Sequence, residues 1–126
     1  MKNKILLFLL ALILFSCKHT DTPPSVDYLE AEENSRYWII VSAVIVDYGS
    51  QPLSEIGFCV NYPSNPNPPS YSDCDTIFYS HFNGNVVFRD TINGIDADKN
   101  YLIRAFAKSS AGIGESKIIK IHTPSY

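Results

Sequence analysis

The stretch YLIRAFA, residues 101–107, with the turn SAG at residues 110–112 after it, decides the fold of this chain. One parity of the stretch carries only uncharged side chains, those of Tyr101, Ile103, Ala105 and Ala107. The other parity carries Arg104 and Lys108, together with Leu102 and Phe106. Because side chains alternate between the two faces of a strand, this pattern predicts a β-strand over 101–108 with one face in a core.

Six further segments have the length and composition of short strands, and turn residues separate them. They cover residues 26–33, 37–46, 55–62, 75–82, 86–92 and 115–122. Seven strands at this spacing, with no helix of convincing length among them, predict an antiparallel β-sandwich of the immunoglobulin-like kind. The expected fold class is therefore all-β.

Two of these strand regions and one loop carry specific expectations. Residues 37–46 are apolar on both faces, which predicts a buried strand with Trp38 in the core. The Asn-Gly pair at 83–84 tolerates the positive φ angles of a type I′ turn, so a hairpin is expected there. The loop 63–70 contains four prolines and cannot join a sheet interior, because proline has no amide hydrogen to donate.

The N-terminus has the pattern of a secretory signal. Lys2 and Lys4 precede an unbroken apolar run over residues 5–15. As a helix this run would span roughly 16 Å, which is too short for a bilayer core of about 30 Å but suits a signal peptide. The run ends in Leu14-Phe15-Ser16-Cys17, which resembles the lipobox of bacterial lipoproteins.

This pattern predicts a division of the chain into a signal peptide (1–16), a lipidated Cys17 with a polar tether (17–26) and one domain (27–126). Acyl chains on Cys17 would anchor the protein, since each buried CH₂ contributes about 0.8 kcal/mol. An ordinary signal peptide, with Cys17 in place by chance, is the alternative.

The composition excludes some partners. The chain is 45% hydrophobic and 13% aromatic, which is enough for a core. Its net charge is −3, and removal of Lys2 and Lys4 with the signal peptide would leave −5. An acidic balance of this kind provides no electrostatic footprint for nucleic acid or for an anionic membrane surface.

The chain contains three cysteines, and lipidation of Cys17 would leave Cys59 and Cys74 in an oxidising compartment. If the chain returns beside its own strand after the proline-rich loop, the two thiols lie close enough for a disulfide. Two unpaired thiols are the alternative.

Three tyrosines are candidates for contact with a ligand, because they fall at predicted strand ends or in loops: Tyr48, Tyr62 and Tyr71. Exposed aromatic rings stack on sugars or anchor a protein partner. The alternative is partial burial under the proline-rich loop. Leu102 and Phe106, on the outward parity of their strand, are candidates for docking onto a partner.

No catalytic, metal or cofactor site is expected. His19, His81 and His122 are scattered without the spacing of metal ligands. No glycine-rich phosphate loop or activated nucleophile is present in the sequence. Asp47, Asp73 and Asp75 lack the spacing of a calcium loop and are expected to be solvated loop charges.

From about residue 37 to 123, the order of motifs resembles fibronectin type III-like domains of Gram-negative surface lipoproteins. The matching stretches are EIGFC at 55–59, NPNP at 65–68, NGIDA at 93–97 and the two stretches quoted first. The resemblance implies that Tyr101 packs inward at a corner, that Ala105 and Ala107 let the sheets approach, and that Gly112 closes the last turn. It also implies a location in the cell envelope, with a lipid anchor in the outer membrane. Whether the domain faces the periplasm or the cell surface does not follow from the resemblance.

Such domains serve as spacers, adhesins and receptor modules, so the resemblance implies a fold and not an activity. The sequence favours a membrane-anchored, non-catalytic binding or adhesion module for an unidentified glycan or protein. A structural or accessory subunit of an envelope complex is the alternative.

Overall fold

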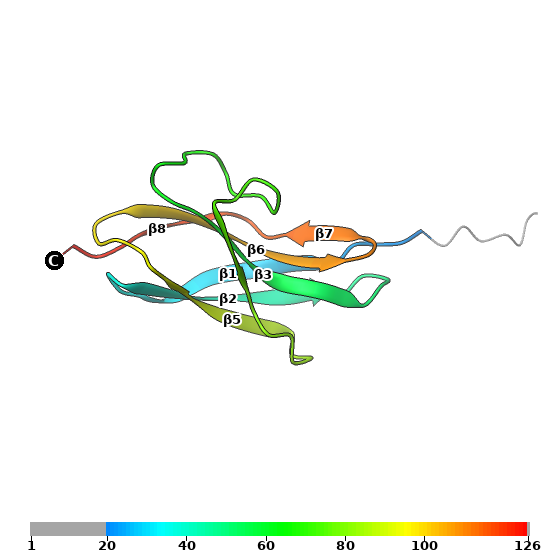
Figure 1. The fold of residues 1–126 in the computed structure, drawn as a ribbon. Coiled ribbons are helices and arrows are strands. Elements are labelled where there is room, and N and C mark those ends of the chain that lie inside the picture. Colours follow the sequence, from blue (N-terminus) through cyan, green and yellow to red (C-terminus); the bar gives the residue numbers. More distant parts are fainter. Residues whose placement is uncertain (1–19, 126) are drawn as a thin grey trace, which may run out of the picture.

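The computed structural model describes residues 20–125, and this part of the chain forms eight β-strands and no helix (Figure 1). The strands are β1 (Ser25–Asn34), β2 (Trp38–Asp47), β3 (Leu53–Asn61), β4 (Thr76–Tyr79), β5 (Val87–Asn93), β6 (Asn100–Ser109), β7 (Gly112–Glu115) and β8 (Ile119–His122). No helix in this described part is long and apolar enough to cross a membrane. The predicted signal peptide and Cys17 lie outside the described residues.

The strands form two antiparallel sheets that pack face to face, which confirms the predicted all-β sandwich. The first sheet has three strands in the order β1-β2-β5. The second has five, in the order β4-β3-β6-β7, with β8 also paired to β6. Ring centroids of Phe58 and Phe88 lie 5.2 Å apart across the space between the sheets, where apolar side chains from both sheets meet.

The strand β6 has the predicted inward face. Tyr101, Ile103, Ala105 and Ala107 are all completely buried. The role of the two alanines in letting the sheets approach stays a prediction. The central strand β2 is buried as predicted over most of its length, with Ile39, Val41, Ala43 and Ile45 facing the core.

The predicted hairpin at 83–84 is wrong. The strand β4 pairs with β3 in the second sheet, whereas β5 pairs with β2 in the first. Residues 80–86 therefore cross from one sheet to the other. Gly84 has a positive φ of 84°, but Asn83 is not among the positive-φ residues, so the type I′ turn does not form. Burial of Phe88 and Ile92 opposite β2 outweighs the local turn preference.

Three other expectations differ from the structure. The last predicted strand, 115–122, is divided into β7 and β8, because the Ser116 hydroxyl accepts the Ala105 amide hydrogen and the Ser116 amide donates to Ala105 O. Trp38 is 36% exposed at the start of β2 and stacks on Tyr37 instead of entering the core. The folded domain also begins before residue 27, since Val26 is already part of the core.

The two ends of the sandwich hold different segments of the chain. We call the end where the chain enters the domain the entry pole, and the opposite end the far pole. The entry pole holds residues 20–24, the turn 47–50 and the β6–β7 turn, where Gly112 (φ 141°) lies against Pro23. At Gly49, a Cβ atom would lie 2.4 Å from the Thr22 carbonyl oxygen, so only glycine fits beside the entering chain. The far pole holds the C-terminus and the β5–β6 connection (Figure 1).

Candidate functional site

A cleft of about 440 Å³ opens at the far pole, on the outer side of the second sheet. Its floor includes Asn61, Leu102 and Lys120, which lie opposite one another on β3, β6 and β8. The rest of the lining comes from Tyr62 and the proline-rich loop after it, and from the end of the β5–β6 connection with the first residue of β6. These residues are Tyr62, Pro63, Asn65, Pro66, Asp98, Lys99 and Asn100. Three segments that are distant in the sequence therefore meet in one hollow.

Asp75 holds the proline-rich loop in place beside the cleft. Its carboxylate accepts the Tyr62 amide hydrogen at 2.8 Å and the Asn65 side-chain amide at 3.0 Å. Its own amide donates to Asn61 Oδ1 at 3.0 Å, and Asn61 Nδ2 donates to Asn67 O at 2.6 Å. Asp75 is exposed, as expected of a loop charge, and its carboxylate is in addition a structural acceptor for this loop.

The other side of the cleft is held by the last residues of the domain. Thr123 is completely buried, and its hydroxyl donates to Asp96 O at 2.6 Å while accepting the Lys99 amide hydrogen at 3.0 Å. The ring nitrogens of His122 lie 2.9 Å from Asn100 Oδ1 and 3.0 Å from Asp98 Oδ1. These contacts hold the connection 98–100 against β8.

Tyr62 links the cleft to the core. Its half-buried ring lines the cleft and meets the Tyr101 ring edge-on at a centroid distance of 5.6 Å. The Tyr101 hydroxyl in turn accepts the Asp96 amide hydrogen at 2.7 Å. Burial raises the pKa of Tyr101, so the phenol stays neutral in the folded domain. The aromatic lining of the cleft therefore has a rigid support.

The cleft combines an apolar surface with groups that both donate and accept hydrogen bonds. Tyr62 and Leu102 provide the apolar part. Asparagine amides donate and accept, lysine ammonium groups only donate, and the Asp98 carboxylate accepts. A few convergent polar groups on an apolar surface are the usual composition of a small-ligand site.

No protein-family model matches this chain, and no curated protein matches it either. Solved structures do match. The FN5 domain of Drosophila Lar is 18% identical, with 83% of this chain and 100% of that chain covered at a TM-score of 0.52. The fourth fibronectin type III domain of a human protein is 14% identical, with coverage of 84% and 78% and a TM-score of 0.55. The fold is fibronectin type III-like.

A bacterial structure has a comparable likeness. The sensor domain of the anti-sigma factor RsgI4 from Pseudobacteroides cellulosolvens is 12% identical, with coverage of 83% and 98% and a TM-score of 0.58. At these identities the likeness establishes a fibronectin type III-like fold and carries no activity across to this chain. Tyr101 lies at the tyrosine corner of such folds, where a hydroxyl bonds to the backbone a few residues upstream.

Tyr71 is not part of the cleft of this fibronectin type III-like domain. Its ring covers Phe106, at a centroid distance of 4.9 Å, and Phe106 is completely buried although it points outward from the sandwich. The Tyr71 hydroxyl donates to Glu55 Oε2 at 2.6 Å, and this hydrogen bond raises the pKa of Tyr71. The expectation that Phe106 offers an open docking surface is therefore wrong, and Leu102 is half-buried in the cleft floor.

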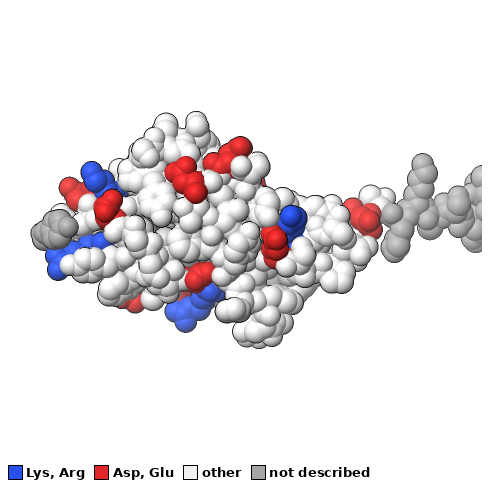
Figure 2. Space-filling view, in the orientation of Figure 1, with Lys and Arg blue, Asp and Glu red and all other residues white. Residues whose placement is uncertain are grey.

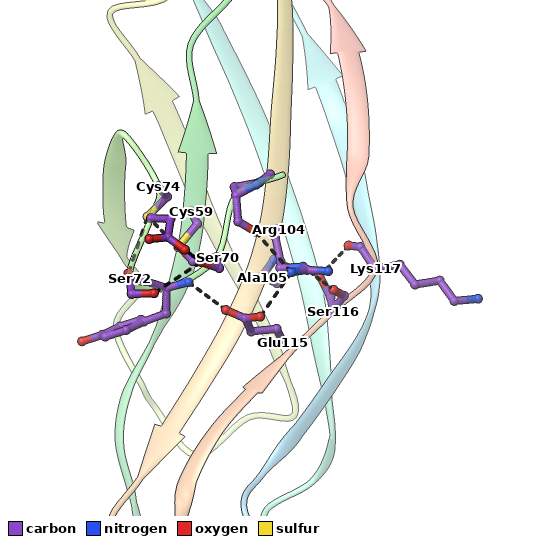
Figure 3. A network of polar contacts seen from close by, with 12 residues as sticks. Cys59, Ser70, Ser72, Cys74, Arg104, Ala105, Glu115, Ser116 and Lys117 are labelled. Atoms are coloured by element: carbon purple, nitrogen blue, oxygen red, sulfur yellow. Dashed lines mark hydrogen bonds and ion pairs between the residues drawn. The ribbon is translucent and has the colours of Figure 1, made fainter. Parts of the chain in front are cut away.

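Arg104 ties the proline-rich loop to the sheet beneath it (Figure 3). Its Nε donates to Ser116 O at 2.8 Å, and its Nη1 donates to Pro69 O and to Glu115 Oε2, both at 3.2 Å. The same Glu115 accepts the Tyr71 amide hydrogen at 2.7 Å. The loop over the second sheet is thus fastened at several points.

Cys59 and Cys74 meet beneath this loop (Figure 3). Neither is bonded to another cysteine in the structure, and the Cys74 thiol donates to Cys59 Sγ at 2.8 Å. Cys59 is buried, and this burial is the main cause that raises the pKa of its thiol. The contact with Cys74 raises the pKa further. The structure brings the two sulfur atoms together, and the disulfide itself stays a prediction.

Tyr48 lies at the entry pole, at the opposite end of the domain from the cleft. Its ring is 38% exposed and meets Phe82 edge-on at a centroid distance of 6.2 Å. The three tyrosines singled out from the sequence therefore occupy three separate places, and only Tyr62 lines the cleft. Within residues 20–125, no group of three His, Cys, Asp or Glu side chains is placed to hold a metal ion.

Sequence reasoning missed most of the polar residues of the cleft, namely Asn65, Asp98, Lys99, Asn100 and Lys120. Asn65 opens the NPNP stretch, and the others belong to no spaced motif because they come from different strands and loops. The only other sequence signal was the order of turn residues at 93–100, which indicates a connection but not its neighbours.

Proposed function

We propose that this chain is a membrane-anchored lipoprotein whose fibronectin type III-like domain is a non-catalytic binding module for a glycan. The observation that carries the proposal is the far-pole cleft, with Tyr62 beside amides, lysines and a carboxylate. The chain enters the domain at the other pole, so an anchor there leaves the cleft directed away from the membrane (Figure 1).

The chemistry of the cleft favours a sugar. Sugar hydroxyls donate and accept hydrogen bonds at once, and the amides of Asn65 and Asn100 can answer both needs. The apolar C–H face of a sugar ring packs on an aromatic side chain such as Tyr62.

The contacts of the reactive side chains support a non-catalytic role. A cysteine nucleophile acts as the thiolate, and burial raises the pKa of Cys59 instead of lowering it. At the cleft, both ring nitrogens of His122 are engaged by Asn100 and Asp98.

Tyr62→Ala should abolish most of the glycan binding, because it removes the aromatic surface of the cleft. Loss of a central aromatic contact costs about 2 kcal/mol or more, which corresponds to an affinity at least roughly 30-fold weaker. The measurement is a glycan array followed by calorimetric titration of the best sugar. Tyr48→Ala is the matched control, since Tyr48 lies at the opposite pole, and it should leave the affinity unchanged. Equal binding by both variants would contradict the site.

Cys17→Ala should abolish acylation of the protein, because the acyl chains have no other attachment point in the lipobox. The measurement is membrane fractionation of cells, with acyl labelling of the wild-type protein and of the variant. Protease treatment of intact cells, with a periplasmic control protein, then tells which side the domain faces. Wild-type protein that takes up no acyl label, or a Cys17→Ala variant that still takes it up, would contradict the lipid anchor.

The exposed Tyr37 and Trp38 at the start of β2 favour a second candidate, an accessory subunit that docks a protein partner. Their rings stack with a centroid distance of 6.3 Å, and the Arg36 guanidinium lies 5.1 Å from the Tyr37 centroid. Tryptophan, tyrosine and arginine dominate protein-binding hot spots. A purified envelope complex that loses this subunit on Trp38→Ala, but keeps it on Tyr62→Ala, would favour this candidate.

A further inference from the structure

The entry pole carries a group of exposed apolar side chains that no contact in the described domain covers. We call it the entry-pole patch: Val46, Tyr48, Phe82, Val86 and Val87. Their exposed fractions are 56%, 38%, 48%, 50% and 48%. Single exposed apolar residues are ordinary on a protein surface, whereas a group of neighbours marks a contact surface.

Direct contacts connect the two segments that carry the patch, the end of β2 with its turn and the crossing segment 80–86 with the start of β5. Tyr48 and Phe82 meet edge-on, and the Tyr48 hydroxyl donates to Gly84 O at 3.5 Å. The Ile45 amide donates to Val86 O at 2.7 Å, and Val44 lies opposite Val87. The turn after β2 and the crossing segment 80–86 thus form one surface.

The two segments of the patch carry almost no charge, and the Asp21 carboxylate lies beside their turn, where it accepts hydrogen bonds from Ser50 and Gln51. Residues 44–50 and 81–87 contain a single charged side chain, Asp47, which accepts the Gly49 amide hydrogen at 2.8 Å. Neither segment contains lysine or arginine. Figure 2 shows the corresponding lobe as uncharged. A patch of this kind suits the interface of a zwitterionic bilayer, where tyrosine and other aromatic rings are favoured, and not attraction to anionic lipids.

The entering chain fixes how far the patch can lie from the membrane. The Thr22 amide donates to Ser50 Oγ at 2.9 Å, and the Ser50 amide donates to Thr22 O at 3.0 Å, so Thr22 is held at the turn beside Tyr48. Cys17 lies five residues earlier, and five extended residues span at most roughly 17 Å. Lipid on Cys17 therefore keeps the entry pole next to the bilayer.

We propose that the entry-pole patch rests in the lipid interface and orients the domain, with the far-pole cleft directed away from the membrane. The inference rests on the lipid anchor of the proposed function and adds a second, non-covalent contact to it. A lipid chain and a shallow apolar contact together bind a membrane more firmly than either alone.

The test uses tryptophan quenching in the full lipidated chain. Trp38 is the sole tryptophan and lies near the far pole, so the wild-type protein serves as the matched control. In the test variant, Trp38→Phe is combined with Phe82→Trp, which places the probe in the patch. Both proteins are reconstituted in phosphatidylcholine vesicles, with and without bromine on the acyl chains.

We expect bromine to quench the fluorescence of the probe at position 82 strongly and that of Trp38 hardly at all. Adding anionic lipid should not increase the quenching. Val86→Trp in the Trp38→Phe background repeats the test should position 82 not tolerate tryptophan. Unquenched emission at both positions, from protein that floats with the vesicles, would overturn the inference and leave the anchor intact. A blue-shifted but unquenched probe would show that protein covers the patch, which also overturns it. Wild-type protein that does not float would overturn the anchor and this inference together.

Discussion

Replacing Tyr101 with alanine should lower the free energy of unfolding by about 3–5 kcal/mol, the usual cost of truncating a large buried aromatic side chain. Tyr101 is completely buried between the sheets and supports the Tyr62 ring in the cleft. Domains of this size are stable by only about 5–15 kcal/mol, so this single change removes a large share. Urea unfolding followed by circular dichroism measures the difference.

Tyr101→Phe separates the hydroxyl from the ring. It keeps the packing but leaves the Asp96 amide hydrogen without the acceptor that it has at 2.7 Å. Because Asp96 is exposed, the cost is that of a typical hydrogen bond, about 0.5–1.5 kcal/mol. If Tyr101→Phe were as stable as the wild type, the hydroxyl contact would not hold the β5–β6 connection. Tyr71→Phe, at a half-buried hydroxyl, is a milder comparison.

Reduction of the oxidised protein should lower the free energy of unfolding by about 3 kcal/mol, because a disulfide between Cys59 and Cys74 closes a loop of about 15 residues. We propose that this bond forms in the oxidising compartment by exchange with a disulfide donor. The two thiols give up two protons and two electrons, and the donor disulfide becomes two thiols. The 2.8 Å contact between the sulfur atoms is the supporting observation.

The measurement is thermal unfolding with and without a reductant, together with a thiol assay under denaturing conditions. For a domain of this size, 3 kcal/mol corresponds to a fall in Tm of about 10 °C or more. The double variant Cys59→Ser, Cys74→Ser is the control and should be insensitive to reductant. Two titratable thiols in protein purified from its native compartment would contradict the bond.

The fold was predictable from sequence where local pattern and burial agree. The alternation along 101–107 places Tyr101 and the two alanines inward, and these residues are completely buried. Where a local preference opposed long-range packing, the prediction was wrong. The Asn-Gly pair at 83–84 favours a hairpin, but Phe88 packs against Phe58 only when β5 pairs with β2.

The candidate site was less predictable than the fold. Tyr62 was selected because it lies at a predicted strand end, and it does line the cleft. Tyr71 was predicted to contact a ligand from its place in a loop, and Phe106 was predicted to face outward from its parity in the strand. Neither criterion shows that one ring covers the other. Burial of an outward side chain depends on where a distant loop settles, and here Arg104 and Glu115 hold that loop in place.

The sequence by itself determined the all-β class and the inward face of β6, and it supplied the prediction of a lipid anchor. Strand periodicity and targeting signals depend only on the order of neighbouring residues. Only the tertiary structure decided which strands pair, where the proline-rich loop lies and which polar residues share a cleft. Asn61, Leu102 and Lys120 become neighbours through strand register, and the entry-pole patch forms where the crossing segment meets the turn after β2. Contacts between distant segments depend on the packing of the whole domain, which no local pattern specifies.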